Sequence, residues 1–348
     1  MTLSEDVLIK QGEILKGPFE VALDITNECN YRCIHCYNAS GENITSDDEM
    51  TDEQVIELIH DIVKLQPYNV CFCGGEPFLR LDLILKSLDI LRSGGIKSTS
   101  LVTNGYFASY EALEKLYEHG LGRIQVSLDG STPESCNLLR RNNRAFDRAI
   151  DALKNAKEVG FKNTSIAFCP TKVNISELEP VVKMCIELGV SLVRVQPLMV
   201  IGRATQNMGE ILPSKKQYIE LIGNIHCLNS KYQDSGIVVE WGDPLDHIFR
   251  YKDDMRNLNA FVNIRANGSI APSPYLPITV GNVKHHKLSV YWGGGLYRAW
   301  SLPQVRRMAD SVLCINDMGT KKADTPDVWY EKDIELDIID DKTFFKED

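Results

Sequence analysis

The chain has 348 residues, which is long for one average-sized domain but enough for a barrel with an appendage. Its 43% hydrophobic and 25% charged residues are typical of a soluble globular protein. The formal net charge of −10 leaves no basic surplus to neutralise phosphate, which argues against general affinity for nucleic acid or an anionic membrane.

The N-terminus has neither the cationic region nor the long apolar core of a signal peptide. No apolar run approaches the roughly 20 residues that a membrane span requires. Ten cysteines in a chain without an export signal indicate reduced thiols or metal ligands rather than disulfides. We therefore expect a cytoplasmic protein that binds neither nucleic acid nor membrane.

From residue 19 to about residue 229, short β-rich runs alternate with amphipathic stretches. Strands are predicted at Val21–Ile25, Asn69–Cys73, Lys97–Thr103, Arg123–Leu128, Thr164–Cys169 and Leu192–Gln196. Helices are predicted at Thr51–Leu65, Leu81–Leu91, Tyr110–Glu118, Phe146–Val159 and Ile175–Leu188, most of them ending near a glycine. This alternation predicts βα units and a parallel sheet, as an open barrel or a doubly wound sheet.

After about Asn229 the alternation stops. The rest of the chain contains several prolines, a glycine run at 293–295 and three short β-like pieces, at Ile237–Trp241, Phe261–Arg265 and Ser269–Ala271. We therefore divide the chain into an N-terminal extension (1–18), a barrel (19–230) and a small irregular α+β domain (231–348). The acidic tail Lys332–Asp348 is expected to be frayed or partly docked.

Three cysteines, Cys29, Cys33 and Cys36, form a CxxxCxxC motif just after the first predicted strand. Thiolates suit iron–sulfur clusters, copper(I) or zinc. A structural zinc site normally has four ligands, and a 4Fe–4S cluster has four irons to satisfy. Three local thiols therefore leave one metal position open, where a small molecule can coordinate; a zinc site or free thiols are the alternatives.

Polar and glycine-rich residues follow the other predicted strands where each one ends. In a βα barrel the reactive groups come from the C-terminal ends of the strands, so these residues predict a single site on one rim. They are Gly74-Gly75-Glu76-Pro77 after the second strand, Thr103 and Asn104 after the third, Ser127 and Asp129 at the fourth, and Gln196 at the sixth.

The CxxxCxxC motif followed by Gly-Gly-Glu-Pro resembles the radical S-adenosylmethionine (radical SAM) enzymes, from about Glu20 to Gln196. The resemblance implies a partial (β/α)6 TIM-type barrel. It implies that Cys29, Cys33 and Cys36 bind three irons of one 4Fe–4S cluster and that S-adenosylmethionine chelates the fourth. An electron from the cluster would then cleave this cofactor to a 5′-deoxyadenosyl radical, which abstracts hydrogen from a substrate.

The resemblance also implies roles in binding S-adenosylmethionine. Gly74 and Gly75 allow close backbone approach, and the turn's carbonyls with the Glu76 carboxylate can accept hydrogen bonds from the ammonium group. His35 lies where the family's backbone touches the adenine, so its ring would add stacking or packing. The remaining candidates are Pro77, Thr103, Asn104, Ser127, Asp129, Arg140 and Gln196.

Two of these candidates have ordinary alternatives. Asp129 could bond the sugar hydroxyls or simply form a turn before Gly130. Arg140 could pair with the methionyl carboxylate or be a solvated surface arginine.

Cys71 and Cys73 lie two apart on the second strand and therefore face the same side. Most buried cysteines act as small hydrophobic residues. Because Cys73 adjoins the Gly-Gly-Glu-Pro turn, it is also a candidate catalytic residue that lines the pocket as a hydrogen donor.

The segments 263–274 and 280–283 resemble the start of a SPASM or twitch domain. Members of that group usually have a cysteine where Ser273 stands and further cysteines downstream, whereas this chain offers only Cys314. One cysteine cannot hold an auxiliary cluster, which needs about four ligands. We therefore expect a single cluster and a degenerate domain that closes the barrel and shapes the substrate entrance.

The substrate is inferred from the resemblance alone. The leading hypothesis is crosslinking, epimerisation or oxidation of a ribosomally made peptide or protein. The alternatives are a small-molecule substrate, such as a tetrapyrrole, quinone precursor or sugar, and a non-catalytic iron–sulfur protein. About twenty residues precede the barrel, so we expect no separate leader-recognition domain there. A flavodoxin or ferredoxin is the expected electron donor.

Overall fold

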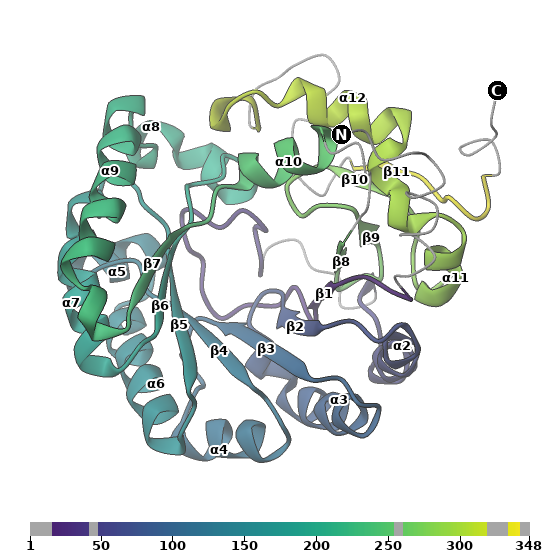
Figure 1. The fold of residues 1–348 in the computed structure, drawn as a ribbon, viewed down its shortest axis with the longest axis horizontal. Coiled ribbons are helices and arrows are strands. Elements are labelled where there is room, and N and C mark those ends of the chain that lie inside the picture. The colour runs from purple at the N-terminus through teal and green to yellow at the C-terminus, as the bar shows by residue number, and fades with distance from the viewer. Residues whose placement is uncertain (1–15, 42–47, 254–259, 319–332, 342–348) are drawn as a thin grey trace.

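A computed structural model describes residues 16–41, 48–253, 260–318 and 333–341. Most of the predicted N-terminal extension and part of the acidic tail lie outside these ranges. Figure 1 shows a curved sheet with helices on its outer side, and the C-terminal elements beside one end of that curve. Within the described residues, no helix is both long and apolar enough to cross a membrane.

The central sheet has nine strands in the order β7-β6-β5-β4-β3-β2-β1-β8-β9. Neighbouring strands are parallel except β8 and β9, which are antiparallel. The six predicted barrel strands are confirmed to within one residue at each end. The strands are β1 (Glu20–Asp24), β2 (Asn69–Cys73), β3 (Ser98–Thr103), β4 (Arg123–Ser127), β5 (Asn163–Phe168), β6 (Leu192–Val195), β7 (Val238–Trp241), β8 (Phe261–Ile264) and β9 (Ile270–Ala271).

The predicted helices are confirmed, although the last begins with a 3-10 turn at Ile175–Glu177. They are α2 (Asp52–Leu65), α3 (Leu81–Ser93), α4 (Tyr110–Glu118), α6 (Ala145–Val159) and α7 (Leu178–Leu188). Thr51 and Gln54 form a capping box that fixes the start of α2. The other helices are α5 (Pro133–Arg140), α8 (Met208–Ile211), α9 (Lys215–Lys231), α10 (Pro244–Asp253), α11 (Leu288–Gly293) and α12 (Pro303–Ser311).

The sheet extends further than the sequence predicted. β7 pairs in parallel with β6, and β8 pairs in parallel with β1, so two pieces assigned to the C-terminal domain belong to the barrel sheet. Both strands have only four residues, and Val238 at the start of β7 is 53% exposed, so neither carries a clear periodic pattern. The expectation that the barrel pattern stops near residue 229 is therefore wrong, and the division at residue 230 stays a prediction.

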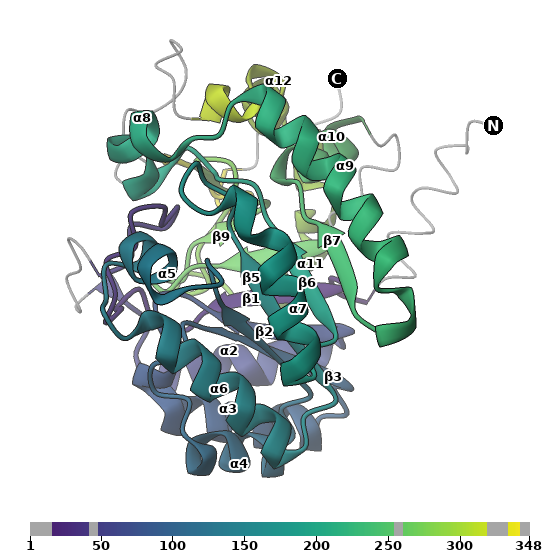
Figure 2. The same cartoon turned by 90° about the vertical axis from the view of Figure 1, so that its left-hand side faces the viewer.

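The strands separate an apolar outer face from a polar inner face, because side chains alternate along each strand. On the outer face, fully buried Val21, Leu23 and Phe72 belong to the core that packs against the helices. Figure 2 shows α5, α6, α7 and α9 covering this side of the sheet. The opposite face carries polar residues and thiols, among them Asp24, Asn69, Cys71, Cys73, Gln125, Ser127 and Arg194.

The C-terminal elements are attached to the barrel through α2. Buried Asp61 on α2 accepts hydrogen bonds from the backbone nitrogen and hydroxyl of Ser289, both at 2.8 Å. The strands β10 (Ile278–Thr279) and β11 (Ile334–Glu335) form a second, two-stranded sheet. The described residues after 264 thus contact α2, and among them β9 pairs with β8, the neighbour of β1 in the sheet.

Candidate functional site

The three cysteines of the motif lie in the loop that follows β1, and each is half-buried. Burial raises the pKa of the Cys33 thiol to about 12; Arg140 opposes this rise, while the neighbouring Cys36 and Cys29 thiols add to it. Burial likewise raises the pKa of Cys29. The Cys29 and Cys33 thiols are therefore poorly solvated, and a metal centre there has to displace their protons.

The spacing of the three sulfurs tests what this loop can hold. At least one pair of the three sulfurs lies more than 4.8 Å apart. A single tetrahedral zinc ion, with bonds of about 2.3 Å, holds its sulfurs only about 3.8 Å apart. The wider spacing fits a multinuclear iron–sulfur cluster, whose cysteine ligands bind different irons.

The Gly-Gly-Glu-Pro turn after β2 packs directly on the backbone of the cysteine loop. The backbone nitrogens of Gly75 and Glu76 donate to the carbonyls of Thr26 and Glu28, both at 2.8 Å. A Cβ on Gly74 would collide with the Thr26 carbonyl, and one on Gly75 with the Glu28 carbonyl. The structure thus gives both glycines a reason that the sequence did not: they let the turn approach the cysteine loop. Their approach to a ligand stays a prediction.

Glu76 is fully buried and joins the end of β2 to the end of β3. Its Oε1 accepts from the Thr103 hydroxyl at 2.7 Å and from the Phe78 backbone nitrogen at 3.2 Å, and its Oε2 accepts from the Asn104 backbone nitrogen at 2.8 Å. Burial raises its pKa to about 7, although these hydrogen bonds act in the opposite direction. The carboxylate therefore orients residues of the rim, and its expected bond to an ammonium group remains untested.

Asn104 connects the end of β3 to the cysteine loop. Its side-chain nitrogen lies 2.8 Å from Asn30 Oδ1 and 3.9 Å from Cys29 Sγ, while its oxygen accepts from the Tyr106 backbone nitrogen at 2.9 Å. An N–H group directed at a sulfur favours the thiolate form. The structure thus brings Thr103, Asn104 and Glu76 together beside the first cysteine.

A buried ion-pair group lies beside the second cysteine. Asp129 Oδ2 is 2.6 Å from Arg140 Nη2 and 3.0 Å from His35 Nε2, and Asp129 Oδ1 accepts from the Cys169 backbone nitrogen at 2.8 Å. Burial alone would raise the pKa of Asp129, but Arg140 and His35 hold it well below its usual range. Arg140 Nη1 lies 4.0 Å from Cys33 Sγ.

This group bears on the ordinary alternatives for two candidates, whose roles in binding S-adenosylmethionine stay predictions. Arg140 is not a solvated surface residue, because its side chain is only 8% exposed and is paired with Asp129. Asp129 is more than a turn residue, because both of its oxygens contact other elements of the site. His35 Nδ1 is buried and has no hydrogen-bond partner among the described residues.

The other predicted site residues lie on the same rim but outside these networks. Ser127 ends β4 and is half-buried, and buried Pro77 starts the 3-10 turn Pro77–Arg80. Gln196 Nε2 is 3.5 Å from the hydroxyl of Tyr275 in the C-terminal part of the chain. This predicted site residue therefore contacts the C-terminal part of the chain.

Cys71 and Cys73 share one face of β2, as predicted, with their sulfurs 3.3 Å apart. The hydrogen bond with Cys71 and burial hold the pKa of Cys73 well above its usual value, so this thiol keeps its hydrogen. Cys73 is the register partner of Asp24 at the end of β1. Burial raises the pKa of Asp24 to about 7, with Arg265 opposing the rise.

Sequence reasoning missed the residues that hold the cysteine loop in place. Buried Arg203 donates to the carbonyls of Cys33 at 2.9 Å and Ser40 at 2.8 Å. Glu49 accepts from the Thr26 hydroxyl at 2.9 Å and from the Asn27 backbone nitrogen at 2.6 Å. Neither residue belongs to a motif, so no local signal identified it.

The expectation of a degenerate C-terminal domain concerns Ser273 and Cys314. Ser273 is fully buried, with its hydroxyl 3.4 Å from His247 Nδ1, and Cys314 is exposed. Cys314 is the one cysteine after residue 230. The prediction of a single cluster rests on this shortage of thiols and remains to be tested.

The sequence is similar to those of known proteins. Residues 23–185 match the model of the Radical SAM superfamily. The mycofactocin maturase MftC of Mycobacterium tuberculosis (strain ATCC 25618 / H37Rv) is 29% identical over 223 residues, which are 64% of this chain and 55% of that protein. The chain therefore spans about half the length of this relative. A probable GTP 3′,8-cyclase of Methanocaldococcus jannaschii is 27% identical over 230 residues, 65% of this chain and 76% of that protein.

The fold also resembles solved structures. SuiB of Streptococcus suis, in its crystal structure bound to S-adenosylmethionine, superposes with a TM-score of 0.70 at 18% identity, covering 91% of this chain and 78% of that chain. The partial-barrel fold expected from the motifs is thereby confirmed. A 4Fe–4S cluster and S-adenosylmethionine are the cofactors of the matching family, in agreement with the cysteine spacing. Residues 23–185, a little under half of the chain, therefore match the Radical SAM superfamily.

Proposed function

We propose that this protein is a radical SAM enzyme that abstracts hydrogen from a ribosomally made peptide or protein, leading to crosslinking, epimerisation or oxidation. The observation that carries the proposal is the convergence of three strand ends. The cysteine loop after β1, the Gly74–Pro77 turn after β2 and Asn104 after β3 are joined by direct hydrogen bonds. Turns that served only to connect a strand to a helix would have no reason to form hydrogen bonds with one another.

In this proposal Cys29, Cys33 and Cys36 bind one 4Fe–4S cluster. When bound, the cluster would supply the electron for reductive cleavage of S-adenosylmethionine, the family's route to a 5′-deoxyadenosyl radical. Asn104 and Arg140 direct N–H groups toward Cys29 and Cys33 and so offset the negative charge of the thiolates. The half-buried loop limits the access of water to these sulfurs.

S-adenosylmethionine is assigned to the rim formed by the Gly74–Pro77 turn and its neighbours. Glu76 holds that turn against Thr103 and Asn104, which fixes where its backbone carbonyls point. The unpartnered His35 Nδ1 is a candidate for a bond to the adenosyl part of the cofactor. Asp129, Arg140, Ser127 and Gln196 would complete the rim.

The substrate is assigned to the polar inner face of the sheet. β7 and β9 are the two edges of the sheet and do not pair with each other, so the barrel is open on one side. An open side suits a substrate longer than a metabolite. Cys73 lies on this face with its thiol protonated, which suits a hydrogen donor to a substrate radical.

Two relatives support different substrates. The similarity to a mycofactocin maturase favours a peptide, as does the shared fold with SuiB, which was also crystallised bound to its precursor peptide SuiA. The similarity to a probable GTP 3′,8-cyclase favours a small molecule as the second candidate. A non-catalytic iron–sulfur protein is disfavoured because the Gly74–Pro77 turn is complete and packed on the cysteine loop. A flavodoxin or ferredoxin would supply electrons.

The test uses anaerobically reconstituted protein with S-adenosylmethionine and dithionite. We expect 5′-deoxyadenosine by mass spectrometry from the wild type and none from Cys33→Ala, while replacement of exposed Cys227 by Ala leaves the yield unchanged. A precursor peptide encoded beside the gene should then change in mass. Formation of 5′-deoxyadenosine without any peptide change, but with turnover of a tetrapyrrole, nucleotide or sugar, would favour the second candidate.

A further inference from the structure

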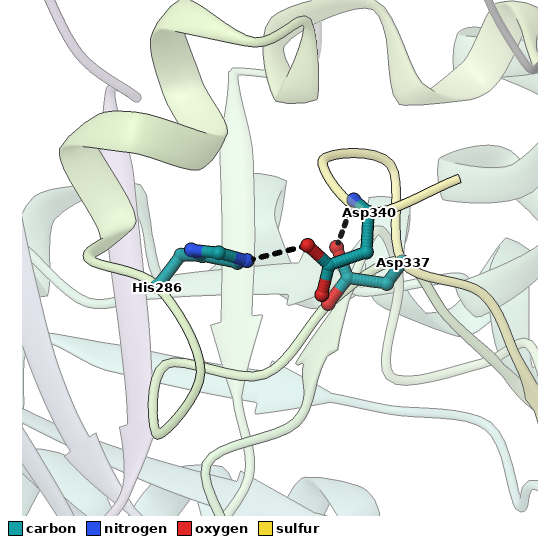
Figure 3. A group of neighbouring side chains, drawn as sticks. All are labelled: His286, Asp337 and Asp340. Atoms are coloured by element: carbon teal, nitrogen blue, oxygen red, sulfur yellow. Dashed lines mark hydrogen bonds and ion pairs between the residues drawn. The ribbon is translucent and has the colours of Figure 1, made fainter. Parts of the chain in front are cut away.

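A cluster of metal-ligating side chains lies away from the cysteine site, between the loop before α11 and the turn after β11. Figure 3 shows the His286 ring and the carboxylates of Asp337 and Asp340 turned toward one another. His286 Nε2 is 2.9 Å from Asp340 Oδ1, and one ligand atom from each of the three residues lies within 4.8 Å of the other two. His285 Nδ1 is 3.7 Å from Asp337 Oδ2.

These separations are close to those of ligands around one metal ion. With bonds of about 2.1 Å, adjacent ligands of a single ion lie about 3.0–3.4 Å apart and opposite ligands about 4.2 Å apart. Imidazole nitrogen combined with carboxylate oxygen suits divalent ions such as zinc and manganese. The two carboxylates together carry the charge that balances a divalent cation. Without a cation between them, the two negative groups repel each other.

The carboxylate of Asp337 is oriented by groups behind it. Fully buried Tyr291 donates its hydroxyl to Asp337 Oδ2 at 2.7 Å, and the backbone nitrogens of Ile339 and Asp340 donate to Oδ1 at 3.0 and 3.3 Å. The Tyr291 ring also packs edge-on against the His286 ring, with centroids 5.7 Å apart. Outer groups that fix the position of the ligands are a regular feature of metal sites.

Two of these three side chains are partly open to solvent. The side chains of His286 and Asp340 are 32% and 62% exposed. Water molecules can therefore complete the coordination that three protein ligands leave unfinished.

We propose that His286, Asp337 and Asp340 bind one divalent transition-metal ion. The ion is distinct from the cluster at Cys29, Cys33 and Cys36, since its ligands are nitrogen and oxygen atoms from the C-terminal part of the chain. It joins segments that lie about fifty residues apart in the sequence, because His286 precedes α11 and the two aspartates follow β11. The ion therefore holds residues 333–341 against the loop before α11.

The test is a titration of the reconstituted, cluster-bearing protein with manganese(II), whose free ion is followed by electron paramagnetic resonance. The cluster is kept in its oxidised, EPR-silent state. We expect one manganese ion bound per chain, and at least tenfold weaker binding in His286→Gln and in Asp340→Asn. Asp341→Asn is the matched control, because it removes the same charge one residue further along and should leave the affinity unchanged.

A second measurement identifies the ligand. Electron spin-echo envelope modulation of the bound manganese should show coupling to an imidazole nitrogen, which is lost in His286→Gln and kept in Asp341→Asn. Binding well below one ion per chain, or equal affinity in all three variants and the wild type, would overturn the proposal. The proposal would also be overturned if only Asp340→Asn weakened manganese binding and the wild type showed no coupling to an imidazole nitrogen. The histidine would then not be a ligand.

Discussion

The ion pair of Asp129 and Arg140 beside the second cysteine leads to a quantitative prediction. The change is Asp129→Asn, which keeps the shape of the side chain and removes its charge. The side chains of Asp129 and Arg140 are only 1% and 8% exposed, so the variant leaves a buried guanidinium without its counter-charge. Breaking a buried pair in this way costs about 3–5 kcal/mol of unfolding free energy.

The expected shift in melting temperature depends on the size of the chain. The entropy of unfolding is about 2.1 cal/mol/K per residue, or about 0.7 kcal/mol/K for 348 residues. A loss of about 3–5 kcal/mol therefore lowers the melting temperature by about 4–7 °C. Differential scanning calorimetry of the reconstituted protein measures this shift.

Asp52→Asn provides a matched control. Asp52 also pairs with an arginine, Arg80, but the Asp52 side chain is 57% exposed. An exposed pair contributes about 0–1 kcal/mol, so this variant should melt within about 1.5 °C of the wild type. If Asp129→Asn melted within a degree of Asp52→Asn, the reasoning about a buried, essential charge pair would be refuted.

Three further predictions concern the same rim. Glu76→Gln removes one acceptor oxygen and leaves a buried N–H or O–H group unpaired. It should therefore lower the unfolding free energy measured in urea by about 1–3 kcal/mol. The control Glu57→Gln changes an exposed residue and should leave the unfolding free energy unchanged. Gly75→Ala places a methyl group against the Glu28 carbonyl and should reduce the bound iron to less than half. Gly209 has open space around it, so Gly209→Ala should leave the bound iron unchanged. Equal iron in the two variants would contradict the packing argument. Burial raises the pKa of Asp24 to about 7, so the folded state binds this proton more tightly than the unfolded state. The free energy of unfolding should therefore fall by up to about 4 kcal/mol as the pH rises from about 4 to about 7. Asp24→Asn should reduce that slope when unfolding is compared at pH 5 and pH 8, while the raised pKa of Glu76 leaves a remainder. An unchanged slope would speak against a protonated Asp24.

The barrel could be predicted from the sequence because its signals are local. Each strand from β1 to β6 is a short β-rich run, and several helices end at a glycine in the left-handed conformation, such as Gly160 and Gly189. The cysteine motif and the Gly-Gly-Glu-Pro turn are likewise contiguous. The site residues could be placed on one rim because parallel strands present their C-terminal ends on the same side.

The contacts between these residues could not be predicted, because they join distant positions. Nothing near Asp129 in the sequence indicates that His35 and Arg140 share its carboxylate. Arg203 reaches the cysteine loop across 170 residues and belongs to no motif. β7 and β8 were missed as barrel strands because a four-residue strand is specified by its neighbours in the sheet more than by its own pattern.

The central claim, that the loop after β1 holds the chain's one 4Fe–4S cluster, is tested most directly by counting iron and sulfide after anaerobic reconstitution. We predict about four irons per chain for the wild type and for the double variant in which exposed Cys227 and Cys314 are replaced by alanine. The triple variant Cys29→Ala, Cys33→Ala, Cys36→Ala should hold almost none. About four irons retained in the triple variant, or seven to eight in the wild type, would contradict the account.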